Sequence, residues 1–187
     1  MLNVISTADL WLENMLLGVR TPFFLHLFNW ITLLGNTITV LAVTGIVVLF
    51  LLLYKKSYRA YAVGLAAAVI GAGITSYMVK IIVERARPGG LIPSVIDTSF
   101  SFPSGHATLA MALYGFLTYL LCKAYPKHTA FITALAVLFI LAIGFSRLYL
   151  GVHFPSDIIA GYLLGVIWLL IGIKIASRLK RNDIIAE

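Results

Sequence analysis

Five long apolar runs, separated by short segments that carry most of the basic residues, constrain this chain more than any other feature. The runs cover about residues 37–53, 60–79, 104–121, 129–145 and 155–175. Each is close to the length that a helix needs to cross the hydrocarbon core of a bilayer, and only 11% of all residues are charged. The sequence therefore predicts an all-α integral membrane protein, built as a bundle of five transmembrane helices.

The N-terminal residues differ from these runs because polar side chains interrupt them. Three stand among the apolar residues of 2–18: Asp9, Glu13 and Asn14. That mixture is typical of an amphipathic helix lying in the membrane interface. Pro22 suits the first turn of a second short helix, which should end near Leu34. We expect interfacial helices here and leave open whether residues 2–34 contain a sixth span.

The 187 residues fit a single domain by length. We divide this domain into a segment of short helices (1–34), a transmembrane core (35–178) and a cytoplasmic tail (179–187). The net charge of +7 would suggest nucleic acid in a soluble protein. Here the basic residues lie between apolar runs, which is how membrane topology is encoded, so we expect no nucleic-acid partner. No obligate protein partner is evident either.

The positions of the basic residues predict the orientation in the membrane. Nine of the fourteen Lys and Arg residues follow the first or third run or stand at the end of the fifth: Lys55, Lys56, Arg59, Lys123, Lys127, Lys174, Arg178, Lys180 and Arg181. The positive-inside rule places these segments in the cytoplasm. We therefore expect a multi-pass protein of the cell's cytoplasmic (inner) membrane, with the opposite helix ends at the extracytoplasmic face.

Three polar motifs fall at that extracytoplasmic face. They are Lys80-x6-Arg87-Pro88, Pro103-Ser104-Gly105-His106 and Ser146-Arg147-x5-His153-x3-Asp157. Polar groups are costly near a bilayer, so such a cluster indicates a functional site. Two predicted helices also begin at this face, near Ser104 and Pro155, and their free amides favour an anion.

The residue types suit the transfer of a phosphoryl group. His153 offers a nitrogen nucleophile, and Asp157 could accept a hydrogen bond from its other ring nitrogen. Arg147 presents a planar fork of donors to phosphate oxygens. However, Pro155 disfavours helical geometry in the preceding residue. We therefore expect His153 to precede the helix, and spacing alone does not establish its contact with Asp157.

Each residue also has an ordinary interpretation when it is taken alone. Lys80, Arg85 and Arg87 could extend toward water from a helix end, and Arg147 and His106 could be interfacial residues. Asp157 and Ser104 could simply cap helices, and Gly105 could simply allow close approach. We expect Glu84 and Arg85 to be surface or loop-positioning groups, Tyr149 to be a packing residue, and His128, at the opposite face, to be silent in catalysis.

Together the three motifs resemble the signature of the type 2 phosphatidic acid phosphatase superfamily, whose members include membrane lipid phosphatases. The resemblance implies that His153 attacks phosphorus to form a phosphohistidine and that Asp157 orients its ring. His106 would protonate the leaving group and then activate water. The phosphoryl oxygens would be bound by Lys80, Arg87, Ser104, Gly105 and Arg147. No metal and no other cofactor is expected.

The function that follows is that of a bacterial-type membrane lipid phosphatase. Its substrate would be a lipid phosphate or diphosphate, such as undecaprenyl diphosphate, phosphatidylglycerol phosphate or phosphatidic acid. A lipid phosphotransferase using the same intermediate is one alternative, and a non-catalytic phospholipid binder or transporter is another. The combination of His106, His153 and Asp157 favours an enzyme, because binding alone needs cations but no nucleophile with an orienting acid.

Overall fold

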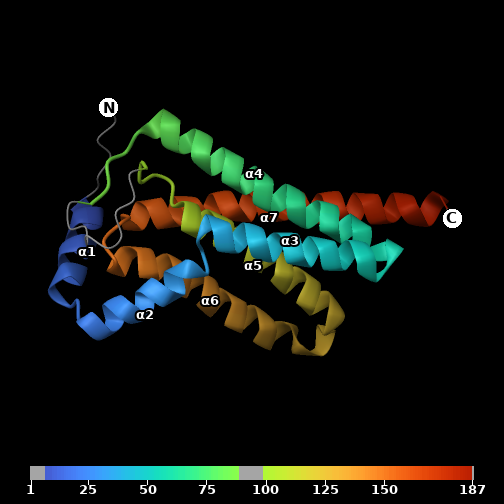
Figure 1. Cartoon of the computed structure of the whole chain (residues 1–187), viewed down its shortest axis with the longest axis horizontal. Helices are drawn as coiled ribbons and strands as arrows, with labels where there is room; N and C mark the ends of the chain where they lie inside the picture. The colour runs from blue at the N-terminus through green and yellow to red at the C-terminus, as the bar shows by residue number, and fades with distance from the viewer. Residues whose placement is uncertain (1–6, 89–98, 187) are drawn as a thin grey trace.

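The computed structural model of the chain describes residues 7–88 and 99–186, and their side chains as far as residue 182. The described residues form helices, with no strand among them (Figure 1). In chain order these are α1 (Thr7–Gly18), α2 (Pro22–Leu33), α3 (Thr37–Tyr54), the 3₁₀ turn η1 (Lys56–Tyr58), α4 (Arg59–Val83), α5 (Gly105–Ala124), the 3₁₀ turn η3 (Pro126–His128), α6 (Thr129–Tyr149) and α7 (Pro155–Ala186).

The five predicted spans are confirmed as α3 to α7, which are long and apolar enough to cross a membrane. Each of them runs past its predicted C-terminal end, by one to four residues in α3 to α6 and further in α7. Helix α4 continues to Val83, and α7 continues to Ala186 through nearly all of the segment that we predicted as a tail. No proline or glycine interrupts the sequence from 173 to 186, so nothing in it ends the helix.

Helices α1 and α2 lie across one end of the bundle (Figure 1). Each has 12 residues and is therefore about 18 Å long, which is too short for a hydrocarbon core of about 30 Å. Helix α2 packs on α6, and α1 contacts α6 and α7. Residues 7–33 therefore supply no sixth span; residues 2–6 of the predicted first helix lie outside the described residues.

Tyr149, at the C-terminal end of α6, packs against α2 and binds the turn between α1 and α2. Its ring packs against Phe24 and Phe28 of α2, with centroids 6.2 and 4.7 Å away. Its hydroxyl donates to the carbonyl of Val19 at 3.0 Å and accepts from the Thr21 amide at 3.0 Å. The predicted packing role of Tyr149 is confirmed, and its hydroxyl also fixes the turn between α1 and α2.

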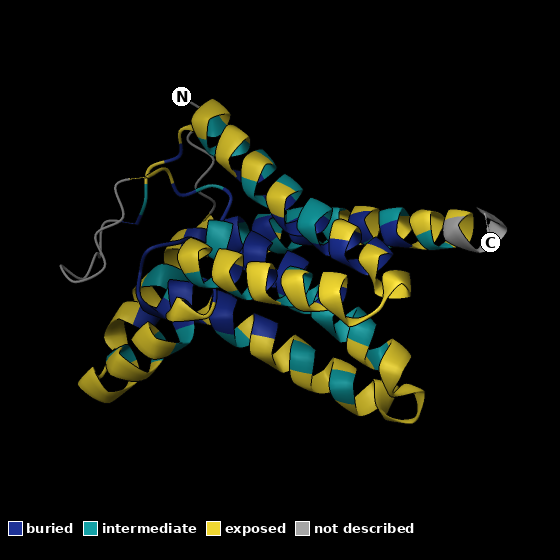
Figure 2. Ribbon diagram, turned by 45° about the vertical axis from the view of Figure 1, so that its right-hand side comes forward, coloured by how far each residue is buried: buried dark blue, intermediate teal, exposed yellow. Residues whose placement is uncertain are grey.

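The bundle is held close by glycines at helix crossings. A Cβ atom on Gly64 of α4 would lie 2.6 Å from the carbonyl oxygen of Gly172 on α7, so those two backbones nearly touch. Gly161 and Gly165 of α7, which have the GxxxG spacing, face α5 in the same way. Buried residues gather where the helices meet, and exposed apolar residues face outward (Figure 2).

The contact between Gly161 and α5 makes a specific prediction about stability. A Cβ atom at residue 161 would lie 2.7 Å from the Ser104 carbonyl oxygen and 2.9 Å from the Ala107 Cβ atom. Because a backbone atom cannot move aside cheaply, Gly161→Ala should lower the free energy of unfolding by about 1–3 kcal/mol, measured by thermal unfolding in detergent.

Gly45→Ala on α3 is the matched control, since nothing lies within 4 Å of a Cβ atom added there. That variant should be neutral or more stable than the original protein, as expected for alanine inside a helix. Equal unfolding temperatures for the two variants would contradict the close-approach interpretation.

Candidate active site

The three motifs meet at the end of the bundle that α1 and α2 cover. The C-terminal end of α4, the start of α5, the C-terminal end of α6 and the start of α7 all lie there (Figure 1). A direct hydrogen bond joins two of the motifs, because the Ser104 amide donates to the Asp157 carbonyl oxygen at 3.0 Å. The close approach of Gly161 to Ser104 makes this contact between the starts of α5 and α7 feasible.

His153 lies between a carboxylate and a guanidinium group. Its Nδ1 is 3.3 Å from Oδ2 of Asp157, and its Nε2 is 3.3 Å from Nη1 of Arg87. Arginine can only donate, so in this geometry Nε2 is the accepting nitrogen and Nδ1 carries the proton that faces Asp157. The arrangement leaves the Nε2 lone pair directed toward a cation.

Asp157 is fully buried, and its two oxygens have different partners. Oδ2 accepts from the Phe154 amide at 2.9 Å as well as facing His153, while Oδ1 accepts from Arg85. Asp157 is the third residue of α7, so its bond to Phe154 is that of a capping carboxylate. The Asp157 side chain therefore both caps α7 and contacts His153. His153 precedes the helix, as predicted.

The start of α5 supplies Ser104, Gly105 and His106. Ser104 is buried and caps the helix, with Oγ accepting from the Ala107 amide at 3.5 Å. Gly105 and His106 are the first two residues of α5. The His106 ring lies beside Gly35, where a Cβ atom would come within 3.3 Å of its Cδ2. The second motif therefore lies between the α2–α3 turn and α7.

Lys80 and Arg87 bind the segment that leads into α5. Lys80 Nζ donates to the carbonyls of Phe100 and Ser101. Arg87 donates Nε to the Ser99 carbonyl at 2.8 Å and Nη1 to the Val152 carbonyl at 2.7 Å. Arg87 thus lies beside His153, and Lys80 binds the same segment before α5 that Arg87 binds. A phosphate-binding role for these two cations stays a prediction.

Arg147 is buried, with 3% of its surface exposed, on the last turn of α6. Its Nη1 donates to Oγ1 of Thr32 on α2 at 2.8 Å. The structure therefore gives this arginine a contact with a helix that the motif does not include. A phosphate-binding role for Arg147 stays a prediction.

Of the two roles expected for Arg85, a surface group or a loop-positioning group, the first is wrong. Arg85 is 7% exposed and forms ion pairs with Asp157 at 2.6 Å and with Asp9 at 2.8 Å. Its neighbour Glu84 is exposed as expected, but has a left-handed φ of 49° that ends α4. This turn directs residue 85 inward, a change of direction that the residue types do not reveal.

Asp9 is a site neighbour that sequence reasoning missed. It is 2% exposed, and its Oδ1 accepts from the Ser156 amide at 3.0 Å while its Oδ2 accepts from the Ser156 hydroxyl at 2.7 Å. The available signal was a carboxylate within a mostly apolar segment, which is costly near a membrane unless it has a partner. The residue types alone assign that carboxylate to the polar face of an interfacial helix.

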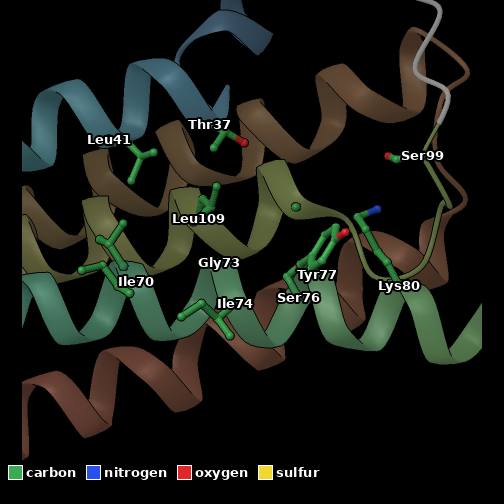
Figure 3. A pocket seen from close by; sticks show the side chains of 12 residues that line it. Thr37, Leu41, Ile70, Gly73, Ile74, Ser76, Tyr77, Lys80, Ser99 and Leu109 are labelled. Carbon is green, nitrogen blue, oxygen red and sulfur yellow. The ribbon is translucent and has the colours of Figure 1, made fainter.

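An apolar groove of about 420 Å³ leads away from this cluster between α3, α4 and α5. Lys80, Ser99 and Gly105 line it at the site end. The rest of the lining is mostly aliphatic, with Thr37, Ser76 and Tyr77 among it (Figure 3). Leu41, Ile70 and Ile74 are exposed on the outer surface of the bundle, so the groove opens sideways. Its lining suits a hydrocarbon chain whose polar end reaches Lys80.

The motifs and the helical bundle agree with comparisons to known proteins. A sequence model of the PAP2 superfamily matches residues 61–181, which include all three motifs. The chain belongs to the PAP2 superfamily. It is 31% identical over 169 residues to phosphatidylglycerophosphatase B of Bacillus subtilis, covering 88% of this chain and 81% of that protein. It is 32% identical over 120 residues to an undecaprenyl-diphosphatase of Sulfolobus acidocaldarius, covering 62% and 55% of the two chains.

The fold agrees with the same family. The crystal structure of a transmembrane PAP2-type phosphatidylglycerolphosphate phosphatase from Bacillus subtilis superposes with a TM-score of 0.86 at 28% identity. The match covers 96% of this chain and 89% of that one. The protein is therefore a multi-pass membrane enzyme of the lipid phosphatase class.

The groove makes a prediction that separates lipid binding from chemistry. Gly73 lines it, and the nearest atom to an added Cβ is Leu109 Cδ2 at 3.7 Å, so a larger side chain fits only by filling the groove. Gly73→Phe should raise KM for a long-chain lipid phosphate about tenfold or more and leave a short soluble phosphate ester unaffected. The measurement is phosphate release from both substrates.

Gly45→Phe on α3 is the control for placing a phenylalanine in a transmembrane helix, because residue 45 does not line the groove. It should match the original protein with both substrates. An equal loss with the long and the short substrate in Gly73→Phe would argue that the groove does not hold the lipid chain.

Proposed function

We propose that this protein hydrolyses the phosphomonoester or the terminal phosphoanhydride of a membrane lipid through a phosphohistidine at His153, without a metal ion. The observation that carries the proposal is the orientation of the imidazole ring. Its Nδ1 faces Asp157 at 3.3 Å and its Nε2 faces Arg87 at 3.3 Å. A nucleophilic lone pair is thus directed at a residue type that binds phosphate oxygens.

In the first step, Nε2 of His153 attacks phosphorus while Lys80, Arg87 and Arg147 neutralise its oxygens, and Ser104 and the Gly105 amide add donors. The bond between phosphorus and the lipid oxygen breaks. His106 gives its proton to that leaving oxygen, so the lipid departs as an alcohol or as a lipid monophosphate.

In the second step, neutral His106 accepts a proton from a water molecule, whose oxygen attacks the phosphohistidine. The phosphorus–nitrogen bond breaks, inorganic phosphate leaves, and His153 recovers its lone pair. The reaction needs no redox partner, and the charge on the phosphoryl oxygens is balanced by side chains.

A lipid substrate is favoured by the groove, whose polar end is formed by the same Lys80 that we assign to phosphate. The names of the relatives favour phosphatidylglycerol phosphate and undecaprenyl diphosphate over phosphatidic acid. We place the site at the extracytoplasmic face of the cytoplasmic membrane, because nine of the fourteen Lys and Arg residues lie toward the opposite end of the bundle.

His153→Ala should abolish turnover, with a loss on the order of 10⁶-fold if it behaves as nucleophile removal does in other enzymes. The measurement is phosphate release from a panel of lipid phosphates by purified protein, without any acceptor lipid and with a chelator present. Phosphate release in that assay would also argue against a phosphotransferase.

His128→Ala is the matched control, since His128 is exposed in η3 at the opposite end of the bundle. It should leave turnover unchanged. Substantial turnover in His153→Ala, or a strict need for added magnesium, would overturn the proposal.

The role of His106 has its own signature. His106→Ala should cost on the order of 10²–10⁴-fold with a lipid phosphate, whose alkoxide leaving group needs a proton. The loss should be much smaller with an aryl phosphate, whose leaving group departs readily as an anion. A comparison of kcat/KM for both substrates checks this, and an equal loss with both would contradict the general-acid role.

A further inference from the structure

We propose that Asp9 and Arg85 are positioning residues for this reaction: Arg85 holds Asp157 against His153, and Asp9 brings helix α1 into the same network. The inference rests on the proposed function, because it assumes that His153 is the nucleophile. Neither residue belongs to the three motifs. Their contacts with the start of α7 bring both residues to the site, and these contacts form only in the folded protein.

Arg85 bridges two buried carboxylates. Its Nη1 donates to Asp157 Oδ1 at 2.6 Å, and its Nη2 donates to Asp9 Oδ2 at 2.8 Å. The side chains of all three residues are at most 6% exposed. Charge-assisted bonds of this length, away from water, fix the carboxylates more firmly than surface ion pairs do.

The guanidinium group is itself held in place by the start of α7. It stacks over the Phe154 ring, with its carbon atom 4.6 Å from the ring centroid, and Nη1 also donates to the Ser156 hydroxyl at 2.7 Å. Phe154, Ser156 and Asp157 flank His153 on the same turn. Arg85 therefore determines which way Asp157 faces: with Oδ1 bound to Arg85, Oδ2 is left for His153.

Asp9 extends this network to a helix outside the transmembrane bundle. Its two oxygens accept from the Ser156 amide and hydroxyl as well as from Arg85. An anion at the start of a helix is favourable, so docking of α1 stabilises the turn that carries His153. The nucleophile is thus fully oriented only when α1 is in place.

The charges suit the reaction as well. Asp9, Arg85 and Asp157 together carry one net negative charge. A histidine phosphorylated on Nε2 and still protonated on Nδ1 carries a positive charge on its ring. The network balances that charge in a site with little water, where an unbalanced charge is costly.

The test compares Asp9→Asn, Arg85→Gln and Arg85→Lys with Glu13→Gln, which makes the same carboxylate-to-amide change on α1. Glu13 is partly exposed. We expect kcat to fall about 10- to 100-fold in the first three variants, with KM and inhibition by inorganic phosphate little changed, because the phosphate-binding cations are untouched. Glu13→Gln should behave as the original protein.

The pH dependence distinguishes positioning from a merely structural role. The other charged or titratable groups of the proposed site are Lys80 from α4, His106 from α5 and Arg147 from α6. His153 itself contacts Asp157 and Arg87, with Arg85 and Asp9 behind Asp157. Only the last two change here. Asp9→Asn removes a negative charge and should move the acidic limb of kcat/KM to lower pH; Arg85→Gln removes a positive charge and should move it to higher pH.

Arg85→Lys keeps the charge but cannot form the same bridge, so it should lower kcat and leave the limb in place. Asp9→Asn keeps the shape of the side chain. If Arg85→Gln does not fold, the kcat and pH profile of Asp9→Asn still test the positioning role. Two results would overturn the proposal. In one, Asp9→Asn and Arg85→Gln unfold at lower temperature but leave the acidic limb of kcat/KM where it is. In the other, the two variants move that limb in the same direction.

The result is separable from the proposed function itself. If His153→Ala retains turnover, the proposed function fails. If His153→Ala is inactive while Asp9→Asn and Arg85→Gln match Glu13→Gln in kcat and in pH profile, only the positioning role fails.

Discussion

The carboxylate of Asp157, buried at the start of α7, is the group on which the rest of this site depends. Its side chain faces His153, caps the helix through the Phe154 amide and pairs with Arg85, and its backbone carbonyl accepts from Ser104. A carboxylate without partners at this depth would be too costly to keep charged. Removing one partner of a buried ion pair typically lowers the stability of a protein by about 3–5 kcal/mol. The contacts of Asp157 therefore depend on one another.

The close packing of α5 on α7 gives this carboxylate its setting. Gly161 and Gly165 let the α7 backbone approach the carbonyls of Ser104 and Thr108, so two helix starts lie side by side. Helix starts present free amides, and the cations of the first motif lie beside them. The site that results suits a phosphate group, and a side chain on either glycine would separate the two halves.

The membrane explains why the site has one polar side and one apolar side. Helices α3 to α7 must satisfy their backbone groups internally, so polar chemistry is confined to the helix ends. The groove between α3, α4 and α5 joins that end to the lipid-facing surface. A substrate can then keep its chain beside apolar side chains while its phosphate reaches Lys80. This arrangement agrees with membership of a superfamily that includes lipid phosphatases.

The amino-acid sequence by itself determined the helical class, the five spans and the three motifs that meet at one end. These follow from local properties: the length of apolar runs, the helix-starting residues near 104 and 155, and polar residues too costly to leave in a bilayer without a role. The position of Pro155 also predicted that His153 lies before the helix, because proline disfavours helical geometry in the residue that precedes it.

Tertiary structure alone decided which charges pair. Arg85 reads as one more basic residue after a span, and Asp9 reads as the polar face of an interfacial helix; 76 positions separate them along the chain. Their pairing depends on the left-handed turn at Glu84 and on the docking of α1 against α6 and α7. The contact of Arg147 with Thr32 was hidden for the same reason. Ion pairs between distant segments depend on how helices pack, and no local pattern of residue types encodes that packing.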